Sequence, residues 1–241
     1  MIALLGFIFG SILGSFIGLV HYRAFDPSHS SSIIVPRSFC ESCKKSLTWY
    51  QLIPMLSFIA LRGSCLHCNQ PIKKEYFYIE LTLALTGSLI FLAQIHLVEM
   101  LIISTIVAAL ALQIISDFKY LRLLDAATIY ILIAAIFLNS VFNTFQTLIN
   151  SFIGLVVGFL ILFCVNKIFY FFRKKNGIGE GDMYLFSALL CLLGIKAAPM
   201  LMFLAAGITI LIGFLQDKLN SEMPFGSGLG IAGVLILLVY V

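Results

Sequence analysis

Two acidic residues stand at the ends of apolar runs in a chain that has only 11 acidic residues among 241. Asp117 follows the run LIISTIVAALALQIIS, and Asp182 follows the glycine-rich segment GIGEG. A carboxylate at a membrane edge is costly unless it is paired or faces water, so it is a functional candidate. Two carboxylates about 3 Å apart share a proton and can polarise a water molecule between them. Asp117 and Asp182 are therefore predicted to form a pair that hydrolyses peptide bonds.

The residues before Asp182 predict its local environment. Gly177, Gly179 and Gly181 let the backbone turn sharply into the helix that Asp182 opens. Because the dipole at a helix N-terminus favours negative charge, we expect Asp182 to be the more ionised member of the pair. A phosphate cradle is the alternative interpretation of these glycines. It is disfavoured because no Lys-Ser/Thr ending follows and the carboxylate would repel phosphate.

Other groups compete for a role in the chemistry. Asp125 lies on the same side as Asp117, and its favoured interpretation is the N-cap of the next helix. Glu80 is expected in the first turn of a helix, where the dipole favours a carboxylate, with a buried functional role as the alternative. The four histidines lie in turns or loops without an evident nucleophile, so a Ser/His/Asp or Cys/His arrangement is not supported.

Four cysteines form two Cys-x-x-Cys pairs, Cys40 with Cys43 and Cys65 with Cys68. Two such pairs at this separation predict one tetrahedral zinc site. Disulfides and free thiols are the alternatives, and disulfides are disfavoured because a cytoplasmic loop is kept reducing. Four thiolates leave no open position for a substrate water, so the predicted zinc would hold the loop in shape rather than catalyse.

Membrane-spanning helices are the elements that must position these residues. Hydrophobic residues make up 61% of the chain and charged residues 11%, against about 25% charged residues in soluble domains. We expect an all-α, polytopic helix bundle in the lipid bilayer, a single domain over residues 1–241 with a cysteine loop at 36–75. About eight spans are predicted, at 1–20, 77–96, 98–116, 125–143, 148–171, 183–195, 198–215 and 228–241. The sixth and eighth are short for a full crossing, so either can be tilted, broken or buried in the bundle.

The basic residues predict the orientation of these spans. With the N-terminus outside, Lys196 is the one basic residue that falls on the outer side, and the others lie at inner loops and their flanks. The inner set is Arg23, Arg37, Lys44, Lys45, Arg62, Lys73, Lys74, Lys119, Arg122, Lys167, Arg173, Lys174, Lys175 and Lys218. Short loops rich in Lys and Arg stay on the cytoplasmic side, so both aspartates and the cysteine loop are expected there.

Two further expectations concern partners and processing. The net charge of +4 does not come with a basic, aromatic-rich face outside the apolar runs, so nucleic acid is not expected as a partner. No basic residue precedes the first apolar run and no small-residue cleavage site follows it. We therefore expect this segment to be retained as a helix, with the mature chain beginning near Met1.

Small residues in the apolar runs predict how helices pack. Glycines recur at every fourth position and leave one face of a helix without side chains, which fits a closely packed neighbour. These glycines are Gly6, Gly10, Gly14 and Gly18 in the first run, and Gly154 and Gly158 in a later one. The glycine faces allow a dimer without requiring one. Cys164 and Cys191 are expected to be small core hydrophobes.

Taken together, these segments resemble the type IV prepilin peptidases, the leader peptidases of pili and DNA-uptake pseudopili, almost end to end. The resemblance is carried by GSILGSFIGLVHYR, CESCKKSLTWYQLIPMLSFIALRGSCLHCNQPIKKEYFYIEL, SDFKYLRLLD, GEGD and MPFGSGLG. It implies that Asp117 and Asp182 are the catalytic aspartates of an endopeptidase in the bacterial plasma membrane. The implied substrate is the short basic leader of a prepilin or pseudopilin, cut after glycine on the cytoplasmic side. Many members also methylate the new N-terminus with S-adenosylmethionine.

Four positions depart from the pattern of this family. Leu124 stands in place of a common Pro, Tyr184 in place of a Lys, and Ser227 in place of the last residue of a Pro-Phe-Gly-Pro segment. Ser64 replaces a basic residue in a region associated with methyl transfer, so the expectation of methylation is the one it affects. None of these departures touches the two catalytic positions.

Two other functions remain as alternatives at this point. A transporter could use Asp117 and Asp182 as proton relays, although the four-cysteine loop argues against it. An intramembrane protease of the presenilin type also carries a Gly-x-Gly-Asp box. Its companion Tyr-Asp pair is absent here, because Ser116 precedes Asp117.

Overall fold

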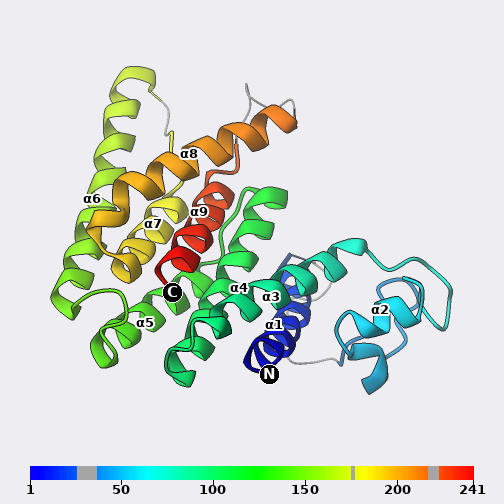
Figure 1. The fold of residues 1–241 in the computed structure, drawn as a ribbon. Coiled ribbons are helices and arrows are strands. Elements are labelled where there is room, and N and C mark those ends of the chain that lie inside the picture. Colours follow the sequence, from blue (N-terminus) through cyan, green and yellow to red (C-terminus); the bar gives the residue numbers. More distant parts are fainter. Residues whose placement is uncertain (26–36, 175–176, 217–222) are drawn as a thin grey trace. The chain divides into compact units, whose positions relative to one another are not determined.

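A computed structural model describes residues 1–25, 37–174, 177–216 and 223–241 of the chain (Figure 1). Pro36, Lys175 and Lys218, which enter the predictions above, lie outside the described residues. The described chain forms helices and short turns, with two isolated β-bridges. The all-α prediction is confirmed. The chain divides into two compact units, Met1–Ile95 and His96–Val241.

The first unit is built on two long helices. These are α1 (Ile2–Phe25) and α3 (Lys74–Leu92), and the segment between them contains η2 (Trp49–Leu52) and the short α2 (Leu56–Ala60). α1 packs along α3. A side chain at Gly14 would put its Cβ 2.6 Å from the Cα of Glu80 on α3, closer than atoms can approach. The predicted packing role of the glycine face is confirmed, because only glycine lets the two backbones come this close.

The second unit contains α4 (Leu97–Tyr120), α5 (Asp125–Val141), α6 (Leu148–Arg173), α7 (Glu180–Leu193), η3 (Ile195–Ala197), α8 (Ala198–Leu215) and α9 (Phe225–Tyr240). Ten of the 14 residues of α7 are buried. This helix packs against α5, α6 and α9, while α9 also packs against α4 and α8 (Figure 1). A mostly apolar helix that is buried this fully forms the core of the unit. Of the three alternatives given for this short segment, burial in the bundle is the one that the structure shows.

The burial of glycines and cysteines in the second unit shows which helix faces are packed and which are exposed. A Cβ on Gly158 of α6 would lie 3.2 Å from the Cα of Ser187 on α7, so the packing role of the later glycine pair is also confirmed. Cys191 on α7 is buried as expected, but Cys164 on α6 is exposed, so its expected place in the core is wrong. The reason is that α6 uses mainly its glycine face for packing and leaves most of its apolar surface outside.

Among the described residues, five helical segments are long and apolar enough to cross a membrane: Ile2–Phe25, Lys74–Leu92, Leu97–Tyr120, Leu148–Arg173 and Ile195–Leu215. The protein is therefore a multi-pass membrane protein. α5 and α9 are shorter apolar helices, and the total of eight crossings stays a prediction, as does the single domain with its inserted loop.

Some helix ends differ from the predicted ones, because the predictions followed the ends of apolar runs and charged residues can continue a helix. α3 begins at Lys74, so Glu80 lies in its second turn and the predicted first-turn position is wrong. The first turn was not predicted because it contains charged residues. α4 continues past Asp117 to Tyr120 and ends where Leu121 adopts a left-handed φ of 51°.

Candidate active site and cysteine cluster

Asp117 lies in the last turn of α4, where 5% of its surface is exposed. The N–H of Ser227 donates to its Oδ2 at 2.6 Å. The Ser227 hydroxyl lies 3.1 Å from the same Oδ2 and 3.0 Å from the carbonyl oxygen of Ile114. These donors belong to the first turn of α9, whose N–H groups have no partners within the helix.

Asp182 is the third residue of α7, and Gly179 is the N-cap of that helix. The side chain turns back toward the N-cap, where a Cβ on Gly179 would lie 3.1 Å from Oδ2 of Asp182. Asn166 on α6 holds the segment before the helix, because its Oδ1 accepts the N–H of Gly177 at 2.9 Å and that of Ile178 at 3.2 Å. The glycine-rich box is therefore anchored on a neighbouring helix, and the helix start predicted from the glycines is confirmed.

The first turn of α9 brings the two carboxylates together. A Cβ on Gly226 would lie 2.9 Å from Oδ1 of Asp182, while the next residue, Ser227, holds Oδ2 of Asp117. A site with two such groups can bind a water molecule between a proton acceptor and a proton donor.

Asp125 lies outside this arrangement. It is exposed, and α5 begins with Asp125 itself, so the N-cap is Leu124 and no side chain caps the helix. The predicted capping role of Asp125 is wrong, because Asp125 is already the first residue of the helix. Gln113 on α4 binds the backbone of the N-cap residue, Leu124. Its Oε1 accepts the N–H of Leu124 at 2.8 Å, and its Nε2 donates to Leu124 O at 3.0 Å and to Thr128 Oγ1 at 2.7 Å.

The four paired cysteines come together in the first unit. The sulfur atoms of Cys40, Cys43, Cys65 and Cys68 all lie within 4.8 Å of one another, and those of Cys40 and Cys68 are 3.9 Å apart. Four thiolates around zinc, at about 2.3 Å from the metal, would be about 3.8 Å from each other. The cluster can therefore hold a tetrahedral metal ion such as zinc.

Both pairs of cysteines are carried by the same kind of turn. The N–H of Lys44 donates to the carbonyl of Cys40 at 2.9 Å, and the N–H of Asn69 donates to the carbonyl of Cys65 at 2.9 Å. Lys44 and Asn69 have left-handed φ values of 58° and 56°. Equivalent turns present their sulfur atoms in equivalent ways, which accounts for the convergence of all four.

Backbone donors favour the thiolate at one position of the cluster. N–H groups of His67 and Cys68 lower the pKa of the Cys65 thiol to about 6, whereas burial and the neighbouring thiols raise the pKa of Cys68 to about 11. A thiolate, rather than a thiol, is the form that binds a metal ion. His67 therefore acts through its backbone, in agreement with its expected positional role between two cysteines.

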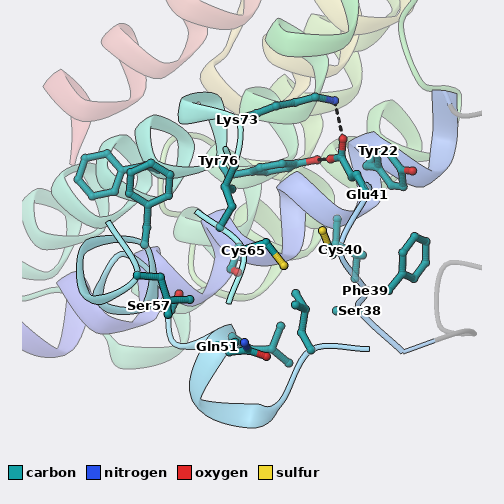
Figure 2. Close-up of a pocket in the computed structure, with 18 of the residues that line it drawn as sticks. Tyr22, Ser38, Phe39, Cys40, Glu41, Gln51, Ser57, Cys65, Lys73 and Tyr76 are labelled. Atoms are coloured by element: carbon teal, nitrogen blue, oxygen red, sulfur yellow. Dashed lines mark hydrogen bonds and ion pairs between the residues drawn. The ribbon is translucent and has the colours of Figure 1, made fainter. Parts of the chain in front are cut away.

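A cavity of about 300 Å³ lies beside the cysteine turns and is shown in Figure 2. Glu41, in the first turn, pairs with Lys73 at 2.7 Å and accepts a hydrogen bond from the hydroxyl of Tyr76. Glu80 also lines the cavity, and Oε2 of this buried side chain accepts the N–H of Met55 at 2.7 Å. These contacts attach the cysteine segment to α3, which carries Tyr76 and Glu80.

Comparisons with known proteins support one family. Residues 8–96 match the bacterial peptidase A24 N-terminal domain, and residues 103–214 match the type IV leader peptidase family. A prepilin leader peptidase/N-methyltransferase of Burkholderia pseudomallei is 33% identical over 212 residues, which cover 86% of this chain and 68% of the relative. This chain belongs to the type IV leader peptidase family.

Relatives from other bacteria carry the same name. The protein of Vibrio cholerae is 29% identical over 234 residues, covering 93% of this chain and 92% of the relative. The protein of Klebsiella pneumoniae is 30% identical over 209 residues, covering 83% and 89%. No solved structure matches this leader peptidase.

Several residues that shape the site were not recognised from the sequence. Gly226 and Ser227 were noted as part of a motif of the prepilin peptidases, but without a role. Asn166 and Gln113 are single amides in apolar runs, which indicates a position facing other helices but not which backbone groups they bind. The glycine-rich start of α9 was the signal that could have located the first two, because glycines mark places where other groups approach the backbone.

Proposed function

We propose that this leader peptidase is a membrane aspartic endopeptidase that removes the short basic leader of type IV prepilins or pseudopilins, with Asp117 and Asp182 as its catalytic pair. The observation that carries the proposal is the convergence of two carboxylates, from α4 and α7, on the first turn of α9. The names of the relatives supply the class of substrate.

The chemistry follows from one shared proton. The ionised carboxylate takes a proton from a water molecule as the water oxygen attacks the scissile carbonyl carbon. The protonated carboxylate donates to the carbonyl oxygen, which would otherwise develop a full negative charge. When the C–N bond breaks, the proton held by the first carboxylate passes to the leaving amine. No covalent bond to the protein forms at any step.

The zinc proposal concerns the shape of the first unit. Cys40, Cys43, Cys65 and Cys68 would hold the ion, and their four thiolates close its coordination sphere. Zinc supplies a crosslink between the two cysteine turns. The residues around it contribute by placing Glu41 against Lys73 and Tyr76 at the start of α3.

The orientation and the second activity belong to the same proposal. The basic loops put both aspartates and the cysteine turns on the cytoplasmic side of the bacterial plasma membrane, where the leader of a prepilin leaves its apolar helix.

Methylation of the new N-terminus with S-adenosylmethionine rests on the second half of the relatives' names. Mass spectrometry of the cleaved substrate, with and without S-adenosylmethionine, tests it; a mature N-terminus that never gains a methyl group contradicts it.

The decisive experiment measures cleavage of a prepilin-like peptide in detergent by purified wild type, Asp117→Asn, Asp182→Asn and Asp125→Asn. We expect each of the first two changes to reduce kcat by at least about 10³-fold, because one carboxylate alone cannot both accept and donate the protons. Asp125→Asn should cleave at close to the wild-type rate, since its side chain is exposed away from the pair.

Other outcomes separate the alternatives. Cleavage retained by Asp117→Asn or Asp182→Asn would remove the proposed pair. A wild type that cleaves no prepilin-like peptide at any pH would instead favour the transporter that uses the same carboxylates as proton relays.

A further inference from the structure

Hydrogen-bond donors are distributed unequally between the two carboxylates. Oδ2 of Asp117 faces two donors of Ser227, the N–H at 2.6 Å and the hydroxyl at 3.1 Å. The carboxylate of Asp182 lies between two glycines: a Cβ on Gly179 would be 3.1 Å from its Oδ2, and a Cβ on Gly226 would be 2.9 Å from its Oδ1. Donors to a carboxylate favour its charged form, because an ionised carboxylate can only accept.

Two helix N-termini therefore act on the pair. α7 begins beside Asp182, as the glycines predict, but α9 points its first turn at Asp117. The tertiary contact with α9 supplies the larger number of donors. It favours ionisation of Asp117, whereas the helix that carries Asp182 led us to expect Asp182 as the more ionised member.

Ser227 is one of the positions where this chain departs from the pattern of the prepilin peptidases. The pattern ends in Pro-Phe-Gly-Pro, and a proline has neither a backbone N–H nor a hydroxyl to donate. The serine here adds both groups. Its N–H donates to Oδ2 of Asp117, and the single hydrogen of its hydroxyl is shared between that oxygen and the carbonyl oxygen of Ile114. The departure thus falls on the residue that contacts the proposed catalytic pair.

We propose that Ser227 is a positioning residue that holds Asp117 as the ionised member of the pair and leaves the shared proton on Asp182. The proposal rests on the proposed endopeptidase function. With Oδ2 held by Ser227, Oδ1 of Asp117 is the oxygen that accepts a proton from the attacking water. Asp182 transfers its proton to the carbonyl oxygen as the new C–O bond forms. On collapse, Asp117 returns its proton to the leaving amine and the hydroxyl of the intermediate returns one to Asp182, so both carboxylates regain their starting states.

In the part of the chain that the structure describes, Lys119 on α4, Asp125 at the start of α5 and Glu180 on α7 are exposed. Helix α9 itself carries no Asp, Glu, Lys, Arg or His. The contribution of α9 to Asp117 is therefore made by hydrogen-bond donors and not by a charged side chain.

The test compares Ser227→Ala, which removes the hydroxyl, with Ser227→Pro, which removes the hydroxyl and the N–H. Proline is compatible with the third position of a helix, where the N–H has no partner within the helix. The matched control is Ser104→Ala on α4, which deletes a buried hydroxyl that donates to its own helix at 2.7 Å. The measurement is kcat/KM for prepilin cleavage as a function of pH.

Removing donors disfavours the ionised form of Asp117 and so raises its pKa. On acidification, the variants should therefore lose activity at a higher pH than the wild type does. We expect the acidic limb of the profile to move up by about half a pH unit in Ser227→Ala and by about one unit in Ser227→Pro, with KM changed less than about twofold. Ser104→Ala should keep the wild-type limb. A melting curve for each variant shows whether it is folded.

The proposal is overturned if the acidic limb stays in place in both Ser227 variants. It is also overturned if the rate falls equally at every pH, because that result indicates a purely structural role. If Ser227→Pro does not fold, the limb of Ser227→Ala decides alone. These outcomes leave the endopeptidase function standing, provided that Asp117→Asn is inactive. Retained cleavage by Asp117→Asn is the separate result that removes the function itself.

Discussion

The acidic pair depends on a residue that has no side chain. Gly226 lies between the two carboxylates, and a Cβ at this position would meet Oδ1 of Asp182 at 2.9 Å and the side chain of Leu123 at 2.8 Å. Both obstacles are ends of side chains that can rotate away. The cost of a larger residue would therefore fall on the position of the carboxylate more than on the stability of the helix bundle.

Gly226→Ala is thus expected to lower kcat by about 10- to 100-fold with a small change in melting temperature, because misplacement by about 1 Å is enough to slow proton transfer strongly. The cleavage assay and a thermal melt measure the two effects. Gly207→Ala is the matched control, since a Cβ there meets nothing within 4 Å. Equal rates in the two variants would show that the pair tolerates a side chain at residue 226.

At the scale of elements, each cysteine turn is weak alone because a left-handed residue costs conformational energy outside glycine. The two turns stabilise each other if a metal ion joins their four sulfur atoms. The exposed ion pair between Glu41 and Lys73 contributes little by itself, since solvent screens exposed charges.

Cys40→Ser and Cys65→Ser should each lower bound zinc from about one ion per chain to near zero, and should lower the melting temperature as the turns separate. Elemental analysis of the purified protein measures the metal. Cys164→Ser is the control, because Cys164 is exposed on α6 and takes no part in the cluster. Protein that is fully folded without metal would contradict the zinc site.

The contact between α1 and α3 can also be disrupted by a single substitution. A Cβ on Gly10 would lie 2.7 Å from the backbone carbonyl carbon of Leu83, which cannot move aside without separating the helices. Gly10→Ala should destabilise the protein by about 1–3 kcal/mol, seen as a lower melting temperature. A melting temperature equal to that of Gly207→Ala would mean that the helices separate at no cost.

At the scale of the whole molecule, the two family matches follow the two compact units closely. Residues 8–96 fall almost entirely in the first unit and residues 103–214 in the second. α9 lies beyond both matches, although it supplies the donors to Asp117. The cysteine cluster and the carboxylate pair thus belong to separately packed parts of one membrane protein.

The orientation can be tested with cysteines placed at Lys119 and Lys196, which are predicted to lie on opposite sides. In intact cells, a membrane-impermeant maleimide should label Lys196→Cys, and should label Lys119→Cys only after permeabilisation, because basic loops stay in the cytoplasm. Replacing Cys164 and Cys191 by serine removes the native thiols outside the cluster. Labelling of Lys119→Cys in intact cells would reverse the predicted topology.

Periodicity, composition and spacing were enough to predict the helical class, the glycine faces and the four-cysteine cluster. Each of these depends on local properties: apolar length, a repeat of four residues, or two short turns with the same hydrogen bonds. Helix ends were less predictable, as Glu80 and Asp125 show, because charged residues can continue a helix and a distant Gln113 can replace a cap.

The sequence by itself determined that this protein spans a membrane, that it carries acidic groups at the ends of apolar runs, and that its cysteines can converge. Only the tertiary structure decided which groups surround the acids. The donors to Asp117 come from a helix 110 residues away in the chain, and no local pattern specifies a contact between such distant segments. The packing of α9 against α4 and α7 makes that contact, and with it the unequal environments of the two carboxylates.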